Sequence, residues 1–427
     1  MPDEKKREGE KNPVIELVTQ QMKEEGIEID PAIAPDENTL SHLDTYISKQ
    51  GVQSVRVSLP NVRKILTLDP RWAGSIRYNL LACSVEIDGK SVRDVDESEI
   101  VCQLGNIYAF KVSENMVSSA MRLVAEGNQY HPVREYLDGV TWDKKPRIDG
   151  LLSSYFGAED TEINKIMGRR FMISAVARAY QMGCQVDTVL VLTGKQGAKK
   201  STGFRALAGG DRFFSDTQLD LNSKDSLMQL KGVWLYEISE MDSMRRSEQT
   251  RIKAFISSRV DRYRPSYGRN VEEQPRGCVF VGTTNDQIFL SDATGSRRFL
   301  PAKIGAVNLP AIIADRDQLW AEATTYYKAG EPWYLSTNEE QKREAAAEDY
   351  ELIHPWTEPI QNYLALNFGP VTTGQIMNQA LDIDVDKRAA FHTKKITEIM
   401  RRLGRESRRV RIDGKRFWAW VKPDDDT

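Results

Sequence analysis

The chain has 427 residues, of which 28% are charged and 40% hydrophobic, and its formal net charge is −3. This composition is ordinary for a soluble globular protein, and the length suggests about two to four domains. It lacks the roughly 18-residue apolar run of a membrane helix. The four widely spaced cysteines exclude a zinc or disulfide framework, so we expect a cytoplasmic protein with reduced thiols.

The first 168 residues predict a leader followed by a small domain. Residues 1–54 are rich in Glu, Lys, Asp and Pro and predict a mobile leader with one short helix over 14–23. Residues 55–168 predict a small, mostly helical domain. Within it, apolar residues at helical spacing indicate a helix over 113–126 with Ser113 as its N-cap.

A different pattern begins at residue 169. Short β-branched runs at 189–192, 233–238 and 278–281 alternate with helical stretches. This alternation predicts an α/β domain over 169–335 with a mostly parallel sheet. The remaining residues, 336–427, predict a polar connector helix and a compact unit with three helices and a closing hairpin.

The central motif is TGKQGAKKST at residues 193–202, which lies between an apolar strand and a helix. That context is the one a phosphate-binding P-loop requires, because loop amides and the helix N-terminus then face phosphate oxygens. Lys200 would reach the β- and γ-phosphates of ATP, and Ser201 would hold Mg²⁺. The candidate nucleotide-binding residues are Gly194, Gln196, Gly197, Ala198, Lys199, Lys200, Ser201 and Thr202.

One position of this motif departs from the general P-loop pattern. Lys199 stands where glycine is usual, so the motif alone is also compatible with a lysine-rich surface turn. If residue 199 has ordinary dihedral angles, the lysine costs little, and if it is left-handed the strain is roughly 1–2 kcal/mol. We expect Lys199 to be tolerated in either case.

Two further motifs follow apolar strands. Glu237 ends one strand and suits a Mg²⁺-binding acid, and Glu240 could orient the attacking water. Asn285 ends the next strand and can sense a γ-phosphate. Without the P-loop upstream, two solvated glutamates at a strand end would be the better interpretation of the first motif, and an asparagine in a turn is a common alternative for the second.

A fourth motif, Arg297-Arg298 after a glycine turn, suits phosphate recognition by a planar guanidinium, although a surface ion pair is the alternative. The loop, the acid, the asparagine and the arginine follow one another in the order that a P-loop motor requires. Four unrelated motif matches would rarely occur in this order. The order therefore favours catalytic roles for Glu237, Glu240, Asn285, Arg297 and Arg298.

Basic residues gather in two regions that suit the DNA backbone. The segment after residue 250 combines basic and aromatic side chains, and its candidates are Lys253, Arg262, Arg264 and Arg269. An exposed basic loop without a ligand explains its composition as well. The C-terminal unit predicts a winged helix, for DNA or for protein, with these candidate DNA contacts: Lys394, Lys395, Arg401, Arg402, Arg405, Arg408 and Arg409.

The sequence resembles the virulence-associated protein E family, a branch of the superfamily 3 helicases of phages and mobile elements. The resemblance covers about residues 59–422 and depends on seven motifs, at 130–137, 142–143, 194–202, 237–241, 261–264, 282–285 and 294–299. It implies ATP-driven unwinding of DNA by a ring-shaped homo-oligomer during replication of a mobile element. It also implies that the basic stretch after Lys253 contacts DNA. Many relatives have a primase domain upstream, for which this sequence shows neither room nor motif, so we expect a separate primase or other replication protein to supply priming.

Two other functions remain compatible with these residues. The first is a DNA-binding replication initiator or scaffold with a weak or inactive nucleotide site, which Lys199 and the separated acids Glu237 and Glu240 favour. The second is a small-molecule kinase, which leaves the basic C-terminal unit without a role. DNA-stimulated ATP turnover distinguishes the motor from the scaffold.

Overall fold

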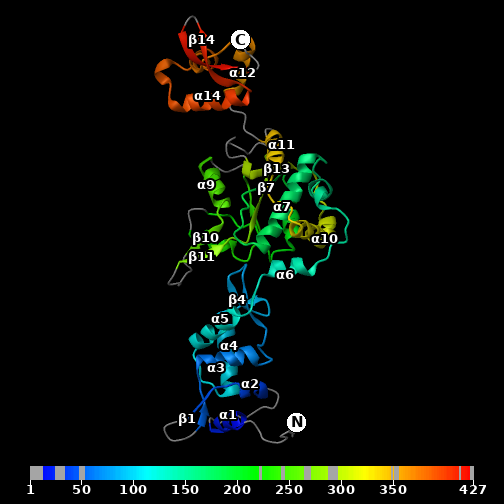
Figure 1. Ribbon diagram of the computed structural model, residues 1–427, viewed down its shortest axis with the longest axis vertical. Coiled ribbons are helices and arrows are strands. Elements are labelled where there is room, and N and C mark those ends of the chain that lie inside the picture. Colours follow the sequence, from blue (N-terminus) through cyan, green and yellow to red (C-terminus); the bar gives the residue numbers. More distant parts are fainter. Residues whose placement is uncertain are drawn as a thin grey trace, which may run out of the picture. The chain divides into compact units, whose positions relative to one another are not determined.

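The computed structural model describes residues 13–24, 34–47, 53–220, 224–241, 246–263, 271–286, 297–347, 350, 355–412 and 415–423. Of these, the residues up to 347 form one unit and those from 350 onward form a second, and each is described by itself (Figure 1). Within these ranges, no helix is both long and apolar enough to cross a membrane.

The N-terminal part of the first unit combines helices with a small sheet. Its strands β5, β4, β3 and β6 form a four-stranded sheet in that order, and β1 pairs with β2. The prediction of a mostly helical domain missed this sheet, because strands of two to four residues are too short to show an alternating pattern. The elements are α1 (Pro13–Glu24), α2 (Glu37–Ser41), β1 (Thr45–Ile47), β2 (Gln53–Val55), α3 (Leu59–Leu68), β3 (Ile76–Asn79), β4 (Ser84–Ile87), β5 (Lys90–Ser91), α4 (Asp94–Tyr108), α5 (Glu114–Glu126), β6 (Gln129–Tyr130) and α6 (Pro132–Gly139).

Two predictions made for this region have different outcomes. Ser113 is the N-cap of α5, as expected, because its side chain accepts a hydrogen bond from the Met116 amide. The leader, in contrast, is partly folded: Val18 on α1 is 1% exposed and belongs to one apolar cluster with Leu40 and Val55. The apolar spacing of Val14, Leu17 and Val18 gives α1 a face that this cluster buries.

The centre of the first unit is a five-stranded parallel sheet in the order β13, β7, β12, β9, β8. The sequence predicted β7, β9 and β12, and the structure confirms the mostly parallel α/β arrangement. The elements are η2 (Ile148–Gly150), η3 (Leu151–Tyr155), α7 (Glu162–Tyr180), β7 (Val189–Thr193), α8 (Lys200–Ala208), β8 (Phe214–Ser215), η4 (Lys224–Leu230), β9 (Leu235–Ile238), α9 (Arg246–Ile256), β10 (Val260–Tyr263), β11 (Glu272–Pro275), β12 (Val279–Thr284), β13 (Phe299–Lys303), α10 (Leu309–Lys328) and α11 (Thr337–Ala347).

Burial explains why these runs form the centre of the sheet. Every residue of β7 and β12 is buried, as expected for strands that are covered on both faces. Trp234 and Trp320 are fully buried in the same core, with ring centroids 4.2 Å apart. The register pairs Thr284 of β12 with Thr193 of β7 at their last residues, so the carboxyl ends of both strands meet at one edge. The candidate site residues Gly194 and Asn285 come directly after these two strand ends.

The second unit contains the predicted helices and hairpin. Its elements are α12 (Thr357–Leu366), α13 (Thr373–Gln375), η7 (Ile376–Ala380), η8 (Val385–Lys387), α14 (Ala390–Arg402), β14 (Glu406–Ile412) and β15 (Lys415–Val421). Strands β14 and β15 pair antiparallel along their full length, and Val371 adds a bridge to Trp420. An apolar cluster that includes Ile360, Ile396 and Met400 forms the core.

Candidate functional site

The loop 194–199 connects strand β7 to helix α8 and runs close to neighbouring backbone. A Cβ atom on Gly194 would lie 3.1 Å from the carbonyl oxygen of Ile304, a contact that favours glycine. Gly197 has a φ of +81°. Lys199, the N-cap of α8, has a φ of +63° and a ψ of 33°. It is therefore left-handed, the condition under which the sequence predicts a strain of roughly 1–2 kcal/mol.

Lys200 is the first residue of α8, and its ammonium group lies inside the curve of the loop. The residue is 8% exposed, and Nζ donates hydrogen bonds to the carbonyl oxygens of Gly194 at 2.7 Å and Lys195 at 3.2 Å. It donates a third to Oδ1 of Asn285 at 3.0 Å. The loop and the end of β12 thus hold one cation in place, where it could bind an anion.

Glu237 lies on β9, beside Val281 of β12, and its carboxylate is the buried acid of this site. Oε1 accepts hydrogen bonds from Ser201 Oγ at 2.8 Å and from the hydroxyl of Thr283. Oε2 is buried and has no hydrogen-bond partner among the described residues. Burial raises the pKa of Glu237, and the hydrogen bonds from Thr283 and Ser201 oppose this shift.

A pocket of about 300 Å³ opens between the loop, α8 and the ends of β9 and β12. It brings together Lys199, Lys200, Ser201, Glu240 and Asn285, which the sequence assigned to one site, although Gly194, Gln196 and Glu237 do not line it. The sequence interpretation missed Ser239, Thr283 and Thr284. The lining residues are Gly197, Ala198, Lys199, Lys200, Ser201, Thr202, Ser239, Glu240, Thr283, Thr284 and Asn285.

Glu240 lies at the rim of this pocket in an unusual conformation. It is exposed, and its φ of 51° is left-handed, as at Lys199. Lys199 and Glu240 are the two non-glycine residues of the pocket lining that have this conformation. Strained backbone of this kind often occurs at functional sites, where the surrounding fold holds it.

The paired arginines lie elsewhere. Arg297 is exposed, and Arg298 is half-buried, with Nε donating to Ser257 Oγ at 2.8 Å. Neither residue lines the pocket of its own chain. The structure therefore brings the loop, the acid and the asparagine together, and it leaves the two arginines apart from them.

A protein-family comparison decides which family this site belongs to. The model for the virulence-associated protein E-like domain matches residues 137–352, which is just over half of the chain and includes the whole pocket. The chain belongs to the virulence-associated protein E-like family.

Comparisons with curated proteins and solved structures add less. No curated protein matches the chain. The chain is similar to the apo structure of the NrS-1 C-terminal region (305–718), with 14% identity, a TM-score of 0.48, and coverage of 81% of this chain and 95% of that one. The A form of the same apo region is similar over 67% of this chain and 78% of that one, with 17% identity and a TM-score of 0.40.

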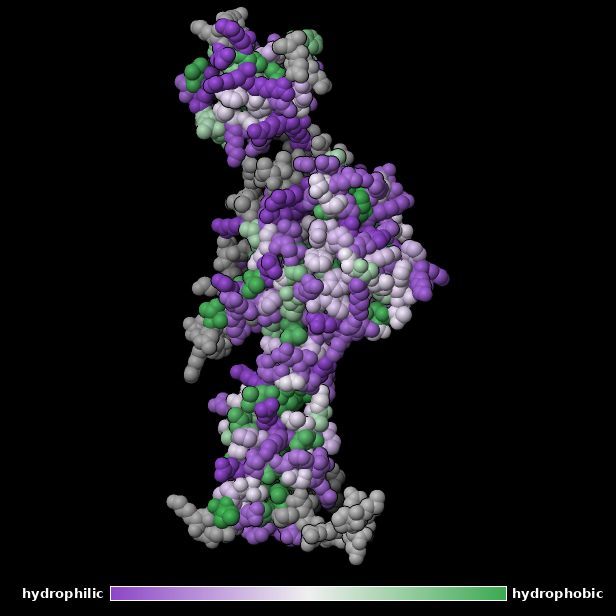
Figure 2. Space-filling model, in the orientation of Figure 1, coloured by the Kyte–Doolittle hydropathy of each residue, from purple (hydrophilic) through white to green (hydrophobic). Residues whose placement is uncertain are grey.

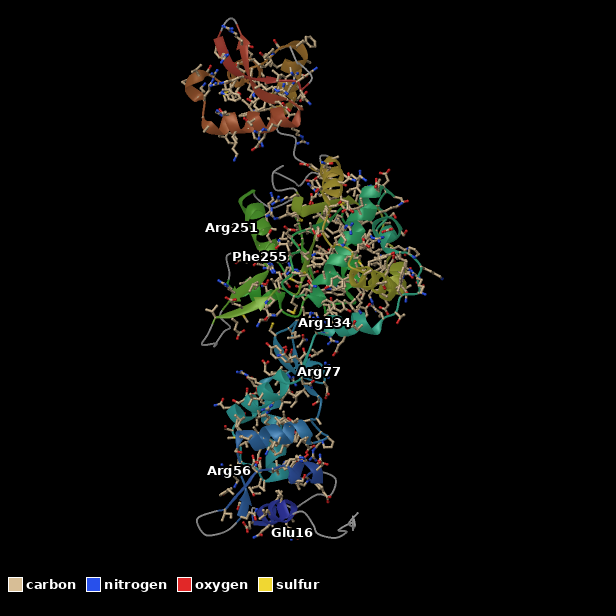
Figure 3. All side chains as sticks on the ribbon, in the orientation of Figure 1. Glu16, Arg56, Arg77, Arg134, Arg251 and Phe255 are labelled. Carbon is tan, nitrogen blue, oxygen red and sulfur yellow. The ribbon has the colours of Figure 1, made fainter. Side chains whose placement is uncertain are left out.

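In this virulence-associated protein E-like chain, the hairpin formed by β10 and β11 is fixed at its base by a buried arginine. Arg276 forms a buried ion pair with Asp261 and donates to the Phe255 carbonyl oxygen at the end of α9. Its guanidinium also lies 4.5 Å from the Phe255 ring centroid. Figure 3 labels Phe255 and Arg251 on this helix.

The DNA-binding candidates near this hairpin have different surroundings. Lys253 is only 9% exposed, so contact with a phosphate would require it to leave its buried position. Arg262 is exposed and pairs with Glu273 across the hairpin, with 2.9 Å between Nη2 and Oε1. Arg264 and Arg269 lie outside the described residues.

The C-terminal candidates are mostly at the surface. Lys394, Arg401, Arg402, Arg408 and Arg409 are exposed. Lys395 is half-buried and pairs with Glu398, with Nζ and Oε2 2.7 Å apart, and Arg408 pairs with Glu406. Arg405, which follows the end of α14 in the chain, was expected to contact DNA at the surface but is only 7% exposed.

Proposed function

We propose that this chain is an ATP-dependent DNA helicase or translocase that acts in the replication of a phage or mobile element. The observation that supports this most is the cluster of Lys200, Ser201, Glu237 and Asn285 at the carboxyl edge of a parallel sheet. Ligands of open α/β sheets bind at this edge, in the crevice outside the strand ends. A lysine, a hydroxyl, an acid and an amide are also the groups that phosphoryl transfer uses.

The pocket has positively charged and N–H donor groups that suit the negative charge of a triphosphate. The amides at the start of α8 and the macrodipole of that helix favour an anion, and Lys200 would contact the β- and γ-phosphate oxygens. Asn285, which accepts a hydrogen bond from Lys200, would contact the γ-phosphate or the attacking water. Exposed Glu240 would orient or deprotonate that water.

The oxygen atoms around Glu237 fit a magnesium ion that enters with ATP. Ser201 and Glu237 would hold it, since Mg²⁺ prefers oxygen ligands and keeps several waters. The buried Oε2 atom of Glu237 lacks a partner among the described residues and could accept from a metal-bound water. Among those residues, no group of three or more His, Cys, Asp and Glu could hold a metal. The metal would supply charge neutralisation at the phosphates.

The second unit would bind DNA as a winged helix. Its order is α12, the bridge from Val371 to Trp420, the short helical segments α13, η7 and η8, then α14 and the hairpin of β14 and β15. In this arrangement α14 is the recognition helix, and the hairpin of β14 and β15 is the wing. Its exposed lysines and arginines would contact phosphates. Resemblance to the family adds a homo-oligomeric ring to this proposal.

Strand displacement tests this function directly. The full chain is incubated with ATP, Mg²⁺ and a forked duplex whose displaced strand is labelled, and release of that strand is followed over time. We expect release with ATP and none with a non-hydrolysable analogue. Tight DNA binding without ATP hydrolysis or release would instead favour a replication initiator or scaffold, which the strained Lys199 makes the leading alternative.

Replacing Lys199 with glycine tests whether the strained lysine impairs the site. Glycine adopts the left-handed conformation without strain, so Lys199→Gly should leave ATP turnover within about tenfold of the parent, or roughly 1.4 kcal/mol in barrier. Relief of strain is partly offset by the greater freedom of glycine in the unfolded chain, so the unfolding free energy should change by about 1 kcal/mol or less. Steady-state turnover and denaturant unfolding measure the two effects.

Two results would contradict this prediction. Complete loss of turnover in Lys199→Gly would show that Lys199 itself contacts phosphate. Turnover that appears only in Lys199→Gly, with an inactive parent, would show that the natural site is degenerate.

Removal of residues 354–427 tests the DNA-binding role of the second unit. We expect weaker duplex binding and a flatter dependence of log K on log salt, because each lost phosphate contact lowers the slope by about one unit. Fluorescence anisotropy with a labelled duplex at several salt concentrations measures both. An unchanged affinity and slope would assign duplex binding to the first unit.

A further inference from the structure

The second unit is unusual in how many aromatic side chains it exposes. Among the described residues, the exposed aromatic side chains are Tyr46, Tyr334, Phe368, Phe391, Phe417 and Trp418, and the last four belong to this unit. On the face shown in Figure 2, this unit, at the top of the view, presents hydrophobic residues between hydrophilic ones. Trp418 is the largest of these side chains and is 63% exposed. Burial is the usual state of tryptophan, so this exposure calls for an explanation.

The register of the hairpin explains how Trp418 reaches the surface. Trp420 and Trp418 are two residues apart on β15 and therefore share one face of the hairpin. Trp420 is 4% exposed, and its indole N–H donates to Thr373 Oγ1 at 3.0 Å in the core. Trp418 lies one step closer to the hairpin tip, beyond the core.

Arginines share this face of the hairpin with Trp418. Arg409 is directly opposite Trp418 on β14, and its guanidinium lies 5.6 Å from the ring centroid. The next pair toward the tip on the same face is Arg411 with Arg416, and both are exposed. We define the Trp418 face as Arg409, Arg411, Arg416 and Trp418. Among the described residues of this face, three are arginines and none is acidic.

We propose that the Trp418 face binds single-stranded nucleic acid, with the indole stacked on an unpaired base and the arginines on the flanking phosphates. This inference rests on the proposed function. It adds single-stranded nucleic acid as a class of substrate, and base stacking on Trp418 as a contact that does not depend on charge. Every base has a π-face, and base stacking on an aromatic side chain changes affinity by about 5-fold to 100-fold on alanine substitution. Bases inside a duplex are already stacked on each other, so an internal duplex site offers the indole no such partner.

The charge of the face favours a nucleic acid over a protein partner. Three arginines that share a hairpin face with one exposed aromatic ring match the alternation of phosphates and bases along a single strand. Tryptophan and arginine also occur in protein interfaces, so self-association through the same face is the competing outcome.

The test compares Trp418→Ala with Phe417→Ala in the full chain, without nucleotide. Phe417 is the matched control because it is an exposed aromatic on the same strand but on the opposite face. Binding to a labelled oligothymidine and to a blunt duplex is measured by fluorescence anisotropy at several salt concentrations. We expect Trp418→Ala to weaken oligothymidine binding about 5-fold to 100-fold with an unchanged salt slope, because no phosphate contact is lost. The oligothymidine affinity of Phe417→Ala should stay within about twofold of the parent, and Trp418→Phe should keep most of the parent's affinity.

Other results would overturn the inference in recognisable ways. Oligothymidine binding that is unaffected by Trp418→Ala, in a parent that binds and hydrolyses ATP normally, would remove this contact and leave the proposed function standing. A change in sedimentation in place of DNA affinity would assign the face to self-association. A parent that binds neither DNA would overturn both proposals. Tryptophan fluorescence reports on Trp418 directly, even if another DNA-binding site dominates the affinity. Oligothymidine should quench the tryptophan fluorescence of the parent, and Trp418→Phe should lose part of that quenching.

Discussion

Replacing Lys200 with alanine is expected to abolish ATP hydrolysis while the fold is retained. Lys200 contributes the ammonium group at the centre of the pocket, held by Gly194, Lys195 and Asn285. Removing one preorganised donor to developing phosphate charge typically lowers turnover about 100-fold to 1000-fold. Steady-state phosphate release at saturating ATP measures the loss, and thermal unfolding shows whether the fold is intact.

Lys195→Ala is the matched control for this substitution. Lys195 belongs to the same loop and has the same charge, but its side chain is exposed and it does not line the pocket. We therefore expect turnover close to that of the parent. Full turnover in a folded Lys200→Ala protein would show that the pocket is not the hydrolytic site.

The paired arginines should act on a neighbouring subunit. Neither Arg297 nor Arg298 lines the pocket of its own chain, and an arginine that completes a site in trans has this property. Such a residue raises turnover by about 10³-fold to 10⁵-fold. Arg298→Ala alone, or Arg297→Ala if that residue is the one that reaches across, should therefore be nearly inactive.

Mixing two inactive proteins tests this arrangement. Arg298→Ala retains Lys200, and Lys200→Ala retains Arg298, so a mixed assembly contains some complete sites and should regain turnover. Lys200→Ala mixed with the double variant Lys200→Ala/Arg298→Ala is the control, because no complete site can form. The idea fails if neither arginine affects hydrolysis, or if the active protein stays monomeric with ATP and DNA.

The sequence predicted the parts of the site that are local along the chain. An apolar run, a glycine loop and a helix start follow each other within residues 189–207, and strands β9 and β12 show similarly continuous apolar patterns. Strand β13 was missed because it contains Pro301, which argues against a central strand. Its place at the edge of the sheet removes that objection, but strand order is not visible in the sequence.

The rest depended on register and on side-chain direction. Thr283 reaches Glu237 because two parallel strands are aligned at one particular offset, which local patterns do not specify. Lys253 and Arg405 were predicted as surface contacts from their charge, yet both lie buried. Long basic side chains can bury their stems against the fold, so composition alone does not separate surface contacts from such positions.

The central claim is that this family member is a DNA-activated motor with a working nucleotide site. Its most direct test is ATP turnover of the purified full chain, measured with Mg²⁺ in the presence and absence of single-stranded DNA, with Lys200→Ala as the background. We predict hydrolysis above that background, increased by DNA. Normal DNA binding with turnover equal to that of Lys200→Ala under both conditions would contradict the claim, and would identify the chain as a DNA-binding scaffold with an inactive site.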